Sequence, residues 1–230
     1  MTNRRFSPLV NPMRIQVFII ELPFEKDDPP EGSRIHQALA QEGISCALRT
    51  VKGKPEFLGA FEAAQNYLCS NKHLIPILHI SAHGNPRAIG VPTWQVAWEE
   101  MIEGLVKTNK AVKGRLILCM SSCEGLRGWK MNLFDESPAF SVLVGSEEKI
   151  TWEQSIAGFT AFYRRLSKGK NVRQAVHAMK CKSSCPSFMT VPGKKVRRIR
   201  EEVERAGAMG FAELNSVRQR YGLAPLVATT

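Results

Sequence analysis

Residues 77–84 read Ile-Leu-His-Ile-Ser-Ala-His-Gly, an apolar run that ends in small residues and a histidine, His83. A second run of the same kind, residues 116–125, reads Leu-Ile-Leu-Cys-Met-Ser-Ser-Cys-Glu-Gly and carries Cys123 near its end. Short apolar runs of this type are typical of strands that are buried on both faces of a parallel sheet. Chemistry in such sheets collects in the crevice beyond the carboxyl ends of the strands. We therefore expect His83 and Cys123 to be delivered to one end of a sheet by neighbouring strands.

Strand-like and helix-like segments alternate along most of the chain. The expected strands are residues 13–22, 44–51, 75–83, 115–121, 140–145 and 187–191. The expected helices are residues 33–42, 55–69, 93–108, 151–166, 171–181, 194–205 and 211–221, with an irregular loop at 126–138. This order predicts crossover connections, and hence an α/β fold in which helices cover both faces of a mostly parallel sheet of about six strands.

The domain organisation expected from this pattern is simple. Residues 1–193 hold all the predicted strands and form one α/β domain, whereas residues 194–230 form a basic helical extension that packs on it. A chain of 230 residues, 43% of them hydrophobic, is long enough for one such domain with a sizeable core.

The positive charge of the chain is concentrated in one segment. The net charge is +11, and residues 154–200 contain twelve lysines and arginines but no aspartate or glutamate. Such a segment can attract nucleic acid, an anionic membrane surface or an acidic protein, or it can be an ordinary solvated face. No aromatic residue after Tyr163 is interleaved with these cations in the manner of a base-stacking platform, which disfavours nucleic acid.

The cellular compartment is expected to be the cytoplasm. The apolar stretch near the N-terminus is interrupted by polar residues and proline, which makes a poor signal peptide, and no run is long enough for a membrane span. Six cysteines in 230 residues are too few for a secreted disulfide scaffold, so we expect reduced thiols. Cys119 lies within a predicted strand and is expected to be buried and chemically inert. His79, four residues before His83 in the same strand, is expected to be a hydrogen-bonded histidine of the core or the crevice.

A cysteine paired with a histidine is a candidate for nucleophilic catalysis. The histidine accepts the thiol proton and later protonates the leaving amine. The oxyanion that forms on the substrate needs two aimed donors, for which the backbone amides of Gly84 and Cys123 are the natural candidates. Gly84 carries no side chain that would obstruct a substrate carbonyl.

These motifs carry a resemblance to a known family. An apolar strand ending in His83-Gly84, followed by an apolar strand ending in Ser122-Cys123-Glu124-Gly125, resembles the caspase-like (clan CD) cysteine peptidases. Within them the sequence is most similar to the CHAT branch, relatives of caspases and separase. Residues 142–146 and 159–175 also resemble that branch's next strand, its Phe-Tyr helix and the Gly-Lys-x-Val-x-x-Ala start of its following helix. The resemblance covers roughly residues 75–179.

The resemblance implies a caspase-like three-layer sandwich and a cysteine endopeptidase that uses no metal and no organic cofactor. It implies His83 as the acid/base, Cys123 as the nucleophile, and the amides of Gly84 and Cys123 as the oxyanion hole. The partner would be a protein substrate, in a setting such as bacterial (antiviral) defence or regulated cell death. The irregular composition of residues 126–137 suggests a loop that an activating protein partner or a processing cut orders.

The sequence gives fewer signals for substrate preference than for the catalytic residues. Many relatives bind a basic P1 side chain with an acidic residue after the fifth strand, but the expected Trp-Asp order is absent here. Glu148 or Glu153 is the candidate replacement, with surface glutamates at a helix start as the alternative. Trp129, beyond the nucleophile, is a candidate to line the substrate cleft.

Two alternatives stand beside the peptidase interpretation. His177, Cys181 and Cys185 recur at four-residue spacing, but structural zinc uses four ligands, so ordinary helix packing is expected. From another functional class, the chain could be a non-catalytic module whose basic segment 154–200 binds nucleic acid or an acidic protein.

Overall fold

A computed structural model describes residues 15–22, 30–91, 93–133 and 137–226 of the chain. Its centre is a six-stranded sheet with the order β2-β1-β3-β6-β7-β8. The strands are β1 (Ile15–Glu21), β2 (Ser45–Thr50), β3 (Ile75–Ser81), β6 (Ile117–Ser121), β7 (Val142–Ser146) and β8 (Phe188–Pro192). Every neighbouring pair is parallel except β7 and β8, which are antiparallel. The predicted α/β fold with a mostly parallel sheet of six strands is confirmed.

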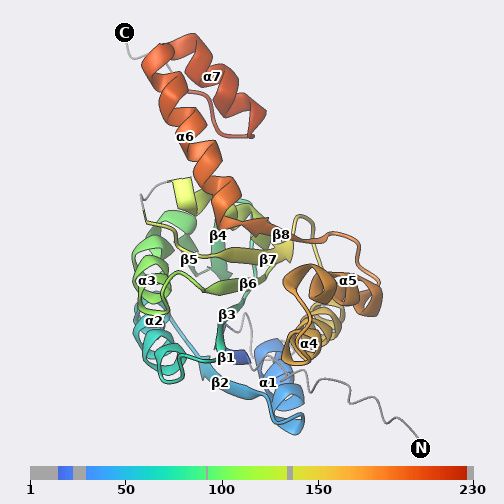
Figure 1. Ribbon diagram of the computed structural model, residues 1–230. Coiled ribbons are helices and arrows are strands. Elements are labelled where there is room, and N and C mark those ends of the chain that lie inside the picture. The colour runs from blue at the N-terminus through green and yellow to red at the C-terminus, as the bar shows by residue number, and fades with distance from the viewer. Residues whose placement is uncertain (1–14, 23–29, 92, 134–136, 227–230) are drawn as a thin grey trace, which may run out of the picture.

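Helices cover both faces of the sheet, as Figure 1 shows. On one face lie α2 (Lys54–Cys69) and α3 (Trp98–Ala111), and on the other lie α1 (Glu31–Gln41), α4 (Trp152–Ser167) and α5 (Val172–Ser183). Each layer has its own hydrophobic core, because the strands bury side chains on both faces. The molecule is therefore the three-layer sandwich that the sequence predicted.

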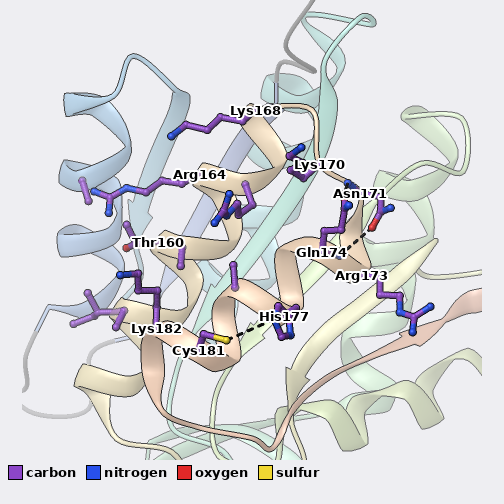
Figure 2. Close-up of a pocket in the computed structure, with 16 residues that line it drawn as sticks. Thr160, Arg164, Lys168, Lys170, Asn171, Arg173, Gln174, His177, Cys181 and Lys182 are labelled. Carbon is purple, nitrogen blue, oxygen red and sulfur yellow. Dashed lines mark hydrogen bonds between the residues drawn. The ribbon is translucent and has the colours of Figure 1, made fainter. Parts of the chain in front are cut away.

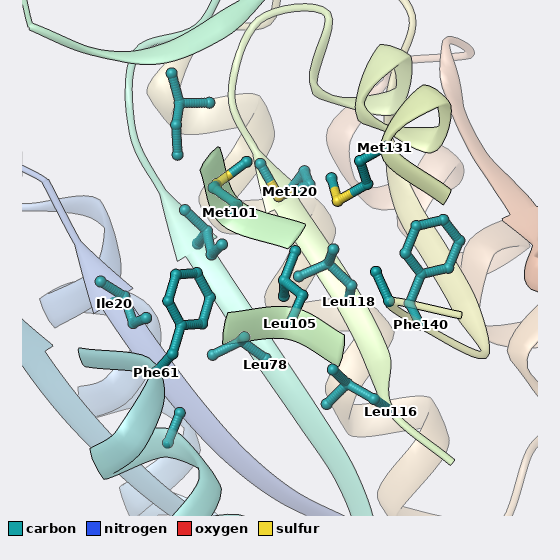
Figure 3. Close-up of a cluster of buried hydrophobic side chains, with 14 of the residues drawn as sticks. Ile20, Phe61, Leu78, Met101, Leu105, Leu116, Leu118, Met120, Met131 and Phe140 are labelled. Atoms are coloured by element: carbon teal, nitrogen blue, oxygen red, sulfur yellow. The ribbon is translucent and has the colours of Figure 1, made fainter. Parts of the chain in front are cut away.

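The core on the side of α2 and α3 illustrates why the apolar strands are buried. Figure 3 shows Phe61 of α2 and Met101 and Leu105 of α3 gathered over Leu78 of β3 and Leu118 of β6. Leu78, Met101, Leu105 and Leu118 have no exposed surface at all. Strands β3 and β6 are the two central strands of the sheet, and their apolar side chains are packed on this face by α2 and α3.

The segment after β3 differs from the prediction. Residues 93–108 were expected to form one helix capped by Thr93, whereas β4 (Ala88–Val91) and β5 (Trp94–Ala97) form a small antiparallel hairpin before α3 begins at Trp98. The helix prediction was wrong at its start because residues 94–97 pair with β4, and Val96 is buried as a strand residue. The Glu100 carboxylate, three residues beyond Ala97, accepts a hydrogen bond from the Ala97 amide and stabilises the start of the helix at Trp98.

The segment after β6 also differs from the irregular loop expected at 126–138. Residues Gly125–Leu133 form a 3-10 helix, η1, in which Leu126 and Met131 are buried in the core. These apolar anchors hold η1 against the sandwich. Residues 134–136 of the expected loop and residues 13–14 of the expected first strand lie outside the described residues.

The C-terminal part consists of α6 (Gly193–Met209) and α7 (Phe211–Arg220). Helix α6 begins against β8 and η1, where Val196 and Ile199 are buried, and then extends away from the sandwich (Figure 1). Helix α7 folds back along α6 and is fixed by the buried Val217 and by the bond from the Tyr221 hydroxyl to Glu202. Within the described ranges, no helix has the length and apolar character needed to cross a lipid bilayer.

Candidate active site

His83 and Cys123 follow the ends of two adjacent parallel strands. Ser81, the last residue of β3, is paired with Ser121, the last residue of β6. The Ala82 amide donates to the Ser121 carbonyl at 3.1 Å and continues the ladder by one more bond. His83 and Cys123 are each two residues beyond this paired position, so the two strands carry them to the same carboxyl end of the sheet.

The two turns that carry these residues touch each other. A Cβ atom placed on Gly84 would lie 2.8 Å from the Cys123 carbonyl oxygen and 2.8 Å from the Ser122 Cβ atom. No side chain fits at that distance, so glycine at position 84 is what lets the His83 turn lie directly on the Cys123 turn. The close approach of the two motifs is therefore a property of the backbone.

Both side chains line one cavity of about 250 Å³. The His83 ring meets the Trp152 ring edge-on, with 5.0 Å between the ring centroids, and the Cys123 sulfur lies 3.8 Å from the Ile150 carbonyl oxygen. His83 and Cys123 are each half-buried, which leaves both accessible from the cavity. A base and a thiol thus share a small, partly enclosed space.

Within the described residues, the amides predicted as oxyanion donors have no competing backbone partner. In the described part of the chain, neither the Gly84 nor the Cys123 amide donates a hydrogen bond to another backbone group. Their neighbours are fixed, since the Asn85 amide donates to the Ala88 carbonyl at 3.0 Å and the Gly90 amide donates to the His83 carbonyl at 3.1 Å. Two free amides on fixed, contacting turns are suited to receive a carbonyl oxygen that becomes negatively charged.

The turn after Cys123 is strained and tightly held. Glu124 adopts a positive φ of 55°, which is unfavourable for a residue with a side chain. Its amide donates to the Glu148 carbonyl at 3.2 Å, and its carboxylate pairs with Arg127 at 2.8 Å. Gly125 is required for space, because a Cβ atom there would lie 2.9 Å from the Met120 Cβ atom. Lys113 and Ser184 also have positive φ, but only Glu124 of these three adjoins the candidate nucleophile, where backbone strain often accompanies function.

A buried carboxyl group lies next to this cavity. Glu31, at the start of α1, is 1% exposed and accepts hydrogen bonds from the hydroxyls of Ser81, Ser121 and Ser155. Burial raises the pKa of Glu31 to about 7, although the three hydroxyl donors oppose this shift. Ser121 and Ser155 also line the cavity that contains His83 and Cys123, so the charge of Glu31 changes close to pH 7 directly behind its wall.

The substrate-pocket candidates are divided by the structure. Glu153 lines the cavity, whereas Glu148 does not. Instead, the Glu148 carbonyl oxygen accepts hydrogen bonds from the Glu124 amide and the Ser146 hydroxyl. The pKa of Glu153 is lowered by a hydrogen bond from its own backbone amide, with a smaller contribution from Thr151, so its carboxylate is charged at neutral pH. Trp129 packs against the core on the α3 side and is not part of the cavity wall.

Sequence reasoning missed other residues of the site. Trp152 stands against His83 and was not a candidate, although it is the first residue of α4 and adjoins Glu153. Glu31 and Ser155 were also missed, because no local pattern marks residues that meet from segments more than one hundred positions apart. The serine at the end of each strand was a visible signal, since hydroxyls that close two buried strands need an acceptor.

Two strand residues that were not candidates for catalysis, His79 and Cys119, are buried. His79 has no exposed surface, its Nδ1 lies 2.7 Å from the Tyr163 hydroxyl, and desolvation lowers its pKa to about 3, which keeps the ring neutral. Burial raises the pKa of the Cys119 thiol to about 12, so it is not a nucleophile near neutrality. The predicted burial of Cys119 is confirmed, and His79 is a hydrogen-bonded histidine of the core, as expected.

The possible metal ligands on α5 do not converge. His177 and Cys181 are in contact at 3.8 Å, but Cys185 is buried and its sulfur meets the Ser187 hydroxyl at 3.0 Å. Among the residues that the structure describes, no three or more histidines, cysteines or carboxylates are grouped so as to hold a metal ion.

No family model matches the chain, and no curated protein matches it.

Proposed function

We propose that this chain is a cysteine endopeptidase in which Cys123 is the nucleophile and His83 the acid/base. The observation that carries the proposal is the shared cavity of about 250 Å³, which a thiol and an imidazole line from two contacting turns. Within the described residues, the Gly84 and Cys123 amides of these turns donate to no other backbone group. The resemblance to the CHAT branch of caspase-like peptidases supports the same roles. It also motivates the expectations of a protein substrate, an activating protein partner and a setting in bacterial defence.

The chemistry follows from the positions of these groups. His83 accepts the thiol proton as the Cys123 sulfur attacks the scissile carbonyl carbon, and the Gly84 and Cys123 amides stabilise the resulting oxyanion. His83 then gives the proton to the departing amine, the C–N bond breaks, and a thioester remains on Cys123. A water molecule, deprotonated by His83, attacks the thioester and releases the acid product together with the free thiol.

The compartment proposed for this reaction is a reducing one, the cytoplasm. All six cysteines are free thiols, and a catalytic cysteine functions only while it is reduced.

The cavity is of a size to accept one side chain of a substrate rather than a whole ligand, since typical ligand pockets have volumes of about 300–1,000 Å³. Its wall contains the charged carboxylate of Glu153, and no lysine or arginine is among the lining residues. We therefore propose that the P1 residue is arginine or lysine, paired with Glu153.

Peptide-library cleavage tests the proposal. The wild-type protein is expected to cleave after arginine and lysine, as read by mass spectrometry of the products. Glu153→Gln is expected to lower kcat/KM for these peptides by about fivefold, because it removes the carboxylate that pairs with the P1 cation while leaving a side chain of similar size. Glu148→Gln is the matched control and is expected to leave the profile unchanged, because Glu148 does not line the cavity.

Two results would count against these assignments. Cleavage after acidic or apolar residues, unchanged by Glu153→Gln, would show that Glu153 is not the P1 partner. A protein that cleaves no peptide but binds nucleic acid in a steeply salt-dependent manner would favour the alternative, a non-catalytic module that uses the basic segment 154–200.

A further inference from the structure

A second cavity of about 1250 Å³ lies between α4 and α5, and it shares no lining residue with the cavity of His83 and Cys123. Both helices contribute to its wall, and Ala38 of α1 adds to it. Figure 2 shows Arg164, Lys168 and Lys182 extending to one side of this helix pair and Arg173 to the other. Cationic side chains therefore border the cavity on both sides.

The charge of the cavity wall is of one sign. Its lining residues include no aspartate or glutamate, and they include six cations: Arg164, Arg165, Lys168, Lys170, Arg173 and Lys182. Among the described residues, Arg164 pairs with Glu42, and no salt bridge joins the other five to a carboxylate. Five uncompensated positive charges around one space repel each other, and an anion that enters the space relieves this repulsion.

Part of the cavity wall consists of residues with small side chains. Ala157, Ala161 and Ala178 line it, and their short side chains leave the space open. Thr160 also lines it, is only 7% exposed, and has a hydroxyl with no hydrogen-bond partner within the described residues. That hydroxyl has almost no accessible surface, so it lies beneath the cavity wall, and the contacts to a ligand come from the cationic side chains.

We propose that this cavity binds a compact polyphosphate, a small molecule that carries three or more phosphate groups. The number of cations exceeds what one phosphate would need, and guanidinium and ammonium groups are the usual partners of phosphate oxygens. The volume is slightly above the range of about 300–1,000 Å³ for drug-sized ligands, which suits a compact ligand with its bound water. The lining holds no tryptophan, tyrosine or phenylalanine, so it offers no surface on which the bases of a single strand would stack.

Isothermal titration calorimetry with inorganic tripolyphosphate tests this proposal on the full chain. We expect saturable binding at about 50 mM salt that weakens at about 200 mM salt, because screening shortens the reach of the charges. The double variant Arg165→Gln/Arg173→Gln removes one unpaired cation from each of the two helices that line the cavity, α4 and α5, and is expected to weaken binding at least tenfold. Lys194→Gln/Arg197→Gln is the matched control: it removes the same charge from exposed positions on α6, outside the cavity, and is expected to change the affinity less than twofold.

A nucleoside triphosphate in the same titration distinguishes two kinds of ligand, a nucleotide and a phosphate chain without a base. Tighter binding than that of tripolyphosphate assigns the site to nucleotides, and equal binding assigns it to the phosphate chain alone; either result supports the proposal. Absence of tripolyphosphate binding, or equal losses in the two double variants, would overturn it. It would also be overturned if affinity rose with the length of a single-stranded oligonucleotide of up to about 20 nucleotides while tripolyphosphate failed to compete. Repeating the titration with Cys123→Ala keeps this result independent of the peptidase proposal.

Discussion

Replacing Cys123 by alanine is expected to lower kcat/KM for peptide cleavage by about a thousandfold or more. The substitution removes the sulfur atom that forms the covalent intermediate. When residues act as one catalytic unit, deleting one of them removes nearly all of the rate enhancement that the unit provides. Because Cys123 is half-buried and its sulfur makes a long contact of 3.8 Å with the Ile150 carbonyl, the free energy of unfolding is expected to change by less than about 1 kcal/mol.

Initial rates on the best library peptide, together with thermal unfolding of both proteins, measure this effect. Cys181→Ala is the matched control and is expected to keep the wild-type rate. Cys181 is an exposed thiol on α5 that lies outside the cavity of His83 and Cys123. Wild-type cleavage by Cys123→Ala would contradict the assignment of the nucleophile. A variant that lost both activity and folding would be replaced by Cys123→Ser, which keeps the volume of the side chain.

The second large effect concerns stability and pH. The pKa of Glu31 is about 7 in the folded chain, against 4.5 for an ordinary glutamate, because burial disfavours the carboxylate. A raised pKa means that the folded state holds the proton more tightly than the unfolded state. The stabilisation from this group is therefore fully present below pH 4.5 and is lost as the pH rises through 7, by about 3 kcal/mol in total.

Glu31→Gln is expected to remove this dependence, because the amide keeps a similar shape and hydrogen-bonding capacity without a charge that titrates. The difference in unfolding free energy between variant and wild type should move by about 3 kcal/mol in favour of the variant between pH 4.5 and pH 8. Urea unfolding at a series of pH values measures it, with the exposed Glu62→Gln as control. Parallel pH profiles for Glu31→Gln and wild type would show that the Glu31 carboxyl is not held in its neutral form.

The strands and their direction were predictable because each carries its own signal. The apolar runs ending at Ser81 and Ser121 are too short and too continuous for amphipathic helices, and parallel pairing follows from the helices between them. The meeting of His83 and Cys123 in one cavity was predictable for the same reason, since parallel strands bring their carboxyl ends together.

The remainder depends on contacts that no local pattern encodes. The hairpin of β4 and β5 was missed because four-residue strands have too short an alternation to be told from a helix start, and Thr93 resembled a helix cap. Glu31 resembled an exposed loop residue, and only the assembled fold places it against three serines from β3, β6 and α4. Trp152 reads as an ordinary first residue of a helix until α4 is seen to begin beside His83.

The most direct test of the central claim is the rate at which iodoacetamide alkylates Cys123, resolved from the other cysteines by peptide mapping. We predict that near pH 7 Cys123 reacts at least about tenfold faster than Cys69, a free thiol that is also half-buried, and that His83→Ala, but not the exposed control His73→Ala, removes this difference. Equal rates at Cys123 and Cys69, unchanged by His83→Ala, would contradict the claim that the imidazole activates this thiol.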